Sequence, residues 1–239
     1  ITQSIIWSKE SAFVNKKIIS DIRLYKSESQ NEYGYITESF ADKKLNAVVN
    51  RVVMKLRENG FSLGEFDHLY INFITFDIAN EIELSDYIDK YHPWYRYCSV
   101  KINEELYFKL DSEESNKTIL KSIEKVLVGC FATEEFDEKL IHNCVKEAIE
   151  YGEDMLMLFK EKSTSNRKAK IFLRYLDSFK YLPLLRVYDC NDSIIFEKDL
   201  PETITLDCFG NIQLSSKKIT IKPRKNIFAV NMKDIVFEF

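Results

Sequence analysis

The chain of 239 residues has a formal net charge of −4, and 30% of its residues are charged, which is typical of a soluble globular protein. Six glycines and four prolines leave little material for flexible linkers or glycine-rich phosphate loops. No apolar run approaches the roughly 18 residues of a membrane span, and the opening ITQSIIWSKESAF lacks the plan of a signal peptide. We therefore expect a cytoplasmic protein with no membrane partner, whose five cysteines are reduced thiols.

Charge is distributed unevenly along the chain. Residues 77–154 contain nine basic and nineteen acidic side chains, whereas residues 155–239 contain fifteen basic and ten acidic ones. An acidic middle argues against nucleic-acid binding there, because phosphate contacts require Lys and Arg. It either attracts a basic partner or simply forms a solvated surface.

The first third of the chain predicts a strand and one clear amphipathic helix. Ser8 fits the cap of a helix reaching Ser20, although residues 17–25 fit a strand equally well, and residues 33–40 have strand composition. Helical spacing then governs the next segment, and Gly60 follows as a stop. Its apolar positions are Leu45, Val48, Val49, Val52, Val53 and Leu56.

Strands and helices alternate in the middle of the chain. Residues 66–76 predict a strand, and residues 79–90 a short helix or an irregular acidic connection. After Pro93, a strand is expected from Trp94, with residues 105–111 as its partner across a turn. Two helices follow, one from about Asn116 to Gly129 and one over residues 134–162, with a possible kink at Gly152.

The remainder consists of short runs rich in β-branched and aromatic residues, separated by turn residues, which predicts an antiparallel meander. The expected fold class is therefore α+β, with mixed helices and strands in residues 1–162. Residues 163–239 are expected to be mainly antiparallel β-structure, packed with the first region as one globular unit.

No catalytic motif is present. The chain lacks GxSxG, GxxxxGK[ST], GxGxxG, HExxH and CxxC, and its three histidines have no close-spaced partner that would start a zinc site. We expect no cofactor, no metal and no enzymatic activity. The alternatives left open are a hydrolase with a dispersed site, for example one using carboxylates or His68, His92 and Cys98, and a non-enzymatic scaffold or regulatory module.

The densest group of aromatic residues is YHPWYRYC at residues 91–98. Alternation along a strand would place Trp94, Arg96 and Cys98 on one face and Tyr95, Tyr97 and Ser99 on the other, so some rings are expected outside the core. Tyr, Trp and Arg dominate binding hot spots, and carboxylates flank this stretch. Core packing and an interface both remain as readings. The interface reading assigns partner binding to Trp94, Tyr95, Arg96, Tyr97, Glu83, Asp86 and Asp89.

The segments EIELSDYIDKYHPWYRY and FGNIQLSSKKITIKPRKNIFAV, within an acidic, glycine-poor α+β chain, resemble the immunity proteins of bacterial polymorphic toxin systems. This resemblance implies a protein that neutralises a cognate toxin, often a basic nuclease, by covering its active site. The basic C-terminal third departs from a uniformly acidic inhibitor. We therefore expect a cytoplasmic protein-binding inhibitor with a basic toxin domain as its partner.

Overall fold

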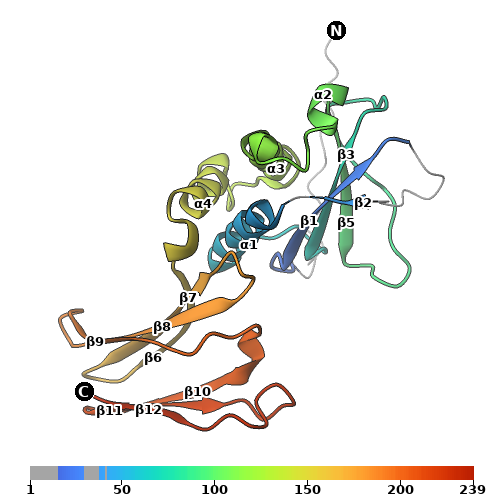
Figure 1. The fold of residues 1–239 in the computed structure, drawn as a ribbon. Helices are drawn as coiled ribbons and strands as arrows, with labels where there is room; N and C mark the ends of the chain where they lie inside the picture. Colours follow the sequence, from blue (N-terminus) through green and yellow to red (C-terminus); the bar gives the residue numbers. More distant parts are fainter. Residues whose placement is uncertain (1–15, 30–37, 41) are drawn as a thin grey trace.

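The expected α+β class is confirmed by the computed structural model, which describes residues 16–29, 38–40 and 42–239. A mixed sheet covered by helices is followed by two antiparallel sheets (Figure 1). The helix expected from Ser8 falls mainly on residues outside these ranges, as does most of the strand expected at 33–40. The described residues 16–20 are not helical, and the alternative, a strand within residues 17–25, is confirmed in part by β1, which begins at Asp21.

Five strands form the N-terminal sheet, in the order β2-β1-β3-β5-β4. The three inner strands are parallel, and each edge strand is antiparallel to its neighbour. The strand predictions from residue 66 and from Trp94 are confirmed. The bounds are β1 Asp21–Ser27, β2 Glu38–Ser39, β3 His68–Ile74, β4 Ile82–Leu84 and β5 Tyr95–Lys101.

Helix α1, Lys43–Glu58, confirms the predicted amphipathic helix. The Asp42 side chain begins it by accepting a hydrogen bond from the Leu45 N–H, and Gly60, at φ 71°, follows its end. Together with α3 (Asn116–Phe131) and α4 (Glu138–Glu150), it lies on one side of the N-terminal sheet (Figure 1). Apolar side chains of all three helices and of β1, β3 and β5 form the N-terminal core.

The strand expected at residues 105–111 is wrong. Residues Glu104–Tyr107 form the short helix α2, because the Asn103 side chain accepts a hydrogen bond from the Leu106 N–H at 2.8 Å and starts a helical turn. Two glutamates in the first turn favour the same outcome, since they interact well with a helix N-terminus.

The helix expected over residues 134–162 is also too long. It ends at Glu150 because Gly152 adopts φ 51°, a left-handed conformation that interrupts the helix. A short 3₁₀ turn, Gly152–Asp154, leads into β6, Met157–Ser163, which pairs with β7 across the predicted region boundary.

Two antiparallel sheets complete the chain, with the orders β6-β7-β8-β9 and β10-β11-β12. They pack face to face around a second core, to which both contribute buried side chains (Figure 1). The remaining bounds are β7 Lys168–Tyr175, β8 Tyr181–Tyr188, β9 Ile194–Asp199, β10 Phe209–Leu214, β11 Lys218–Pro223 and β12 Ile235–Glu238.

Candidate functional site

Strand β5 presents alternate side chains to opposite sides of the N-terminal sheet. Cys98 and Val100 are buried in the core beneath the helices. Tyr95 and Tyr97 lie on the other side, where both rings contact Tyr70. The alternation predicted for this strand is therefore confirmed from Tyr95 onward. Trp94, expected on the side of Arg96 and Cys98, precedes the strand, and its ring packs against Tyr95 instead.

Tyr70 is the centre of a cluster of tyrosines on that second side. Its ring stacks on Tyr25 at a centroid distance of 5.5 Å, and it lies 4.6 Å from Tyr95 and 5.2 Å from Tyr97. The in-register pairing of β1, β3 and β5 brings these residues together, since it places Tyr70 directly beside Tyr97. We call this side, made by Tyr25, His68, Tyr70, Tyr95 and Tyr97, the aromatic face.

Residues 85–94, here called the rim loop, fold along one margin of the aromatic face. Tyr87 packs against Tyr97 at 5.5 Å, and the His92 ring stacks on Tyr95 at 4.7 Å with an interplanar angle of 3°. Trp94 packs edge-on against both His92 and Tyr95. The aromatic face thus continues into the loop that precedes β5.

Asp89 fixes the conformation of the rim loop. Its carboxylate accepts hydrogen bonds from the backbone N–H groups of Tyr91, at 2.7 Å, and His92, at 2.8 Å. These bonds, with the one from His92 leading, lower the pKa of Asp89 below its ordinary value. Tyr91 is left projecting into solvent, 77% exposed, and Ile88 is also exposed. The loop is therefore held in a shape that displays apolar surface.

Two tyrosines of the aromatic face have raised pKa values. Burial raises the pKa of Tyr97 to about 12, and burial together with a hydrogen bond to Tyr95 raises the pKa of Tyr70. Charged groups lie on this side of the sheet as well: Arg23, on the inner strand β1, lies over the Tyr70 ring at 5.6 Å and pairs with Asp21. The register of β4 places Glu83 beside Ser99, on the same side as Tyr97. The surface is suited to recognition by aromatic contact and hydrogen bonding.

The predicted binding residues are divided between two environments. The aromatic face includes Tyr95 and Tyr97, and Glu83 lies beside it. The rim loop includes Trp94, which packs against Tyr95, and the exposed Asp86. The same loop contains Asp89, whose carboxylate forms its turn. Arg96 lies apart: it projects from the core side of β5, over the Phe66 ring, and donates a hydrogen bond to the Ser85 carbonyl oxygen at 2.9 Å. This hydrogen bond fixes Ser85, the first residue of the rim loop.

Sequence reasoning missed Tyr25, Tyr70 and Tyr87 as members of the site. Only the parallel pairing of β1, β3 and β5 shows that the rings of Tyr25 and Tyr70 meet those of β5. The useful signal would have been the tyrosines at alternate positions of three separate strands.

The proposed combination of Cys98 with a histidine does not form. Cys98 faces the helices, whereas His68 and His92 both contact Tyr95 on the aromatic face. Within the described ranges, no three His, Cys, Asp or Glu side chains are grouped as metal ligands would be.

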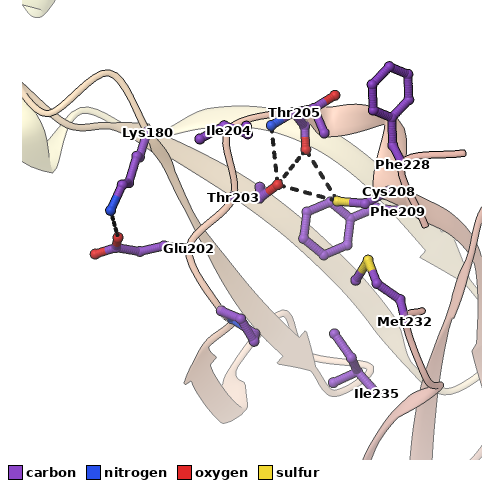
Figure 2. A pocket seen from close by; sticks show the side chains of 11 residues that line it. Lys180, Glu202, Thr203, Ile204, Thr205, Cys208, Phe209, Phe228, Met232 and Ile235 are labelled. Carbon is purple, nitrogen blue, oxygen red and sulfur yellow. Dashed lines mark hydrogen bonds and ion pairs between the residues drawn. The ribbon is translucent and has the colours of Figure 1, made fainter. Parts of the chain in front are cut away.

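A pocket of about 620 Å³ lies at one end of the C-terminal sandwich (Figure 2). Its polar wall groups bond to one another: the Thr203 hydroxyl donates to the Thr205 carbonyl oxygen at 2.7 Å, and the Cys208 thiol donates to the same oxygen at 3.2 Å. Apolar side chains supply much of the remaining wall, and Lys180 pairs with Glu202 among the lining residues (Figure 2). The other lining residues are Pro201, Ile204, Phe209, Phe228, Met232 and Ile235.

The chain has no match among family models, curated proteins or solved structures. In the part of the chain that the structure describes, none of the helices combines the length and apolar composition of a transmembrane span.

Proposed function

We propose that this protein is a protein-binding inhibitor that contacts its partner through the aromatic face and the rim loop. The observation that carries the proposal is the display of Tyr91 and Ile88 on a loop fixed by Asp89. A preformed loop loses little conformational entropy on binding, and exposed aromatic side chains supply large contact areas.

Charge around the rim loop favours a basic partner. Residues 77–94 contain five acidic side chains and one lysine. Two of the acids are neutralised by exposed pairs, Asp77 with Lys101 and Glu81 with Lys125. Glu83 and Asp86 remain beside the aromatic surface, where carboxylates speed association with a cationic protein and orient it.

The resemblance to bacterial immunity proteins gives this proposal its specific form. A cytoplasmic immunity protein would cover the active site of a basic toxin domain and neutralise it stoichiometrically. The aromatic surface supports this form because large rigid side chains suit hot-spot contacts, and the acids suit a surface shaped to bind nucleic acid.

Comparative affinity capture tests the proposal. The tagged full-length chain, an Ile88→Ser/Tyr91→Ala variant and an Asp86→Lys variant are incubated with source-cell lysate, and retained proteins are quantified by mass spectrometry. An Ile194→Ser/Ile195→Ser variant is the matched control, because these exposed isoleucines lie on β9, outside the proposed surface.

We expect the wild type and the β9 control to retain one basic protein. The two rim-loop variants should retain much less of it. The purified partner should lose its activity on adding one equivalent of wild-type protein. Equal retention by the wild type and the Ile88→Ser/Tyr91→Ala variant would contradict the proposal, provided that both chains unfold at the same temperature.

A further inference from the structure

Four apolar side chains project from the end of the C-terminal sandwich that holds the pocket. Ile204 is 78% exposed, Ile227 81%, Val230 77% and Phe228 57%. Ile204 and Phe228 also line the pocket, which brings the two loops that carry these residues together at its rim (Figure 2). We call these four residues the apolar tip.

The exposure of the apolar tip is built into the folded loop. Asn226 accepts hydrogen bonds from the N–H groups of Phe228 and Ala229, both at 3.1 Å, and donates one to the Asp207 carbonyl oxygen at 2.9 Å. Ala229 is buried, and Met232 packs against the second core. The loop is thus anchored through Asn226, Ala229 and Met232 while its larger apolar side chains face outward.

The loop that carries three of the four tip residues is basic, whereas the segment that carries Ile204 contains two acids, Glu202 and Asp207, which are both in ion pairs. Residues 222–234 contain four basic side chains and one acidic one, Asp234. Arg224 is paired with Asp207, whereas Lys222, Lys225 and Lys233 are exposed and form no ion pair within the described residues. The tip therefore combines three aliphatic side chains and one phenyl ring with an excess of unpaired positive charge.

This combination differs from the aromatic face in the partner that it fits. Protein interfaces are enriched in Tyr, Trp and Arg. The aromatic face and the rim loop are rich in Tyr and carboxylates, with Lys90 over the Tyr91 ring and Lys17 over the Trp94 ring. Aliphatic side chains with flanking lysines suit an anionic lipid surface, where the apolar groups enter the headgroup boundary and the ammonium groups meet lipid phosphates.

We propose that the apolar tip docks this protein on an anionic membrane surface. The proposal departs from the sequence-based expectation of no membrane partner, which rested on the lack of a long apolar segment. Peripheral docking requires no such segment, because a few projecting side chains and several cations are sufficient for reversible binding.

Vesicle co-sedimentation of the full chain tests this proposal. Phosphatidylcholine vesicles are compared with vesicles that also contain phosphatidylglycerol, at low and high salt. Two variants remove the two components separately: Ile227→Ser/Val230→Ser removes apolar groups, and Lys225→Glu/Lys233→Glu reverses charge.

Matched controls lie at the opposite end of the sandwich. Lys217→Glu/Lys218→Glu alters two exposed lysines where the β10–β11 turn enters β11, and Ile194→Ser/Ile195→Ser alters two exposed isoleucines on β9. The Ile88→Ser/Tyr91→Ala variant separates this proposal from the binding function, since its vesicle binding should equal that of the wild type.

We expect salt-sensitive binding to the anionic vesicles, weakened roughly tenfold or more by either tip variant and little by the controls. Absence of wild-type binding to anionic vesicles would overturn the proposal. It would also be overturned if the controls weakened binding as much as the tip variants, or if the tip variants released a protein partner while vesicle binding stayed unchanged.

Discussion

Tyr70 shows how one residue acquires a role from its neighbours. It projects from the central strand of the N-terminal sheet, is only 6% exposed, and contacts tyrosines from the strands on both sides. Burial and the bond to Tyr95 raise the pKa of its hydroxyl further above neutral pH. Tyr70 therefore supports the more exposed rings around it.

Cys130 provides a pH-dependent prediction at the same scale. A hydrogen bond from the Cys98 thiol lowers the pKa of Cys130 to about 7, from an ordinary value of 9.0. A lowered pKa means that the reactive thiolate is present above pH 7 and is lost as the pH falls through 7. In a Cys190→Ser background, which removes the exposed thiol, we expect Cys130 alkylation by iodoacetamide to titrate with a midpoint near pH 7.

The matched variant adds Cys98→Ala to the same background. Loss of the donor should return the pKa of Cys130 towards its ordinary value and slow alkylation at pH 7 roughly tenfold or more. Peptide mass mapping identifies the modified residue. An unchanged pH profile after the Cys98 substitution would contradict the assigned hydrogen bond.

At the scale of elements, local periodicity explains what could be predicted. Helix α1 and strands β3 and β5 have strong apolar patterns, and each forms where its pattern predicts. The segment after β5 became helical because Asn103 caps a turn, and α4 ended early because Gly152 adopts a positive φ. Such outcomes depend on one side chain or one dihedral angle, which composition does not reveal.

The candidate site was predictable in part for the same reason. Tyr95 and Tyr97 could be placed together because they share a strand, whereas Tyr25 and Tyr70 reach them only through pairing between strands distant in sequence. The pocket was not predictable, because it is formed by loops and strand ends from several parts of the C-terminal region.

Arg51 supplies a prediction about how elements are joined. It is buried in α1, donates a hydrogen bond to the Tyr175 carbonyl oxygen of β7 at 2.9 Å, and pairs with Asp177. Arg51→Ala would leave that buried carbonyl and Asp177 without this donor, so we expect a loss of about 2–4 kcal/mol in the free energy of unfolding, measured with urea. Arg57→Ala, on the exposed face of the same helix, should cost less than about 0.5 kcal/mol. Equal effects of the two substitutions would contradict this role for Arg51.

At the scale of the whole molecule, β7 connects the two cores. Ala169 and Ile171 are buried between the C-terminal sheets, whereas Leu173 and Tyr175, on the same side of the strand, are buried in the N-terminal core. Because one strand contributes buried side chains to both cores, we expect the helical region and the sandwich to unfold together.

Ile171→Ala tests this coupling. The cavity should destabilise the protein by about 2–5 kcal/mol. Both tryptophans of the chain, Trp7 and Trp94, precede β6. Tryptophan fluorescence therefore reports on the N-terminal region. We expect the fluorescence and circular dichroism midpoints to fall together, with Ile195→Ala on exposed β9 as the control. A fluorescence midpoint that did not move would indicate independent unfolding.

The whole molecule thus presents two different surfaces, an aromatic and acidic one on the N-terminal sheet and an apolar, basic one at the end of the sandwich. Their separation allows each proposed contact to be removed without altering the other. The proposed binding function rests on the first surface.

The most direct test of that function is the dissociation constant of the purified partner for the wild type and for the Ile88→Ser/Tyr91→Ala variant, measured by calorimetry. We predict at least a tenfold weakening, about 1.4 kcal/mol, with an unchanged unfolding temperature. An unchanged dissociation constant would show that the partner binds elsewhere and would contradict the account.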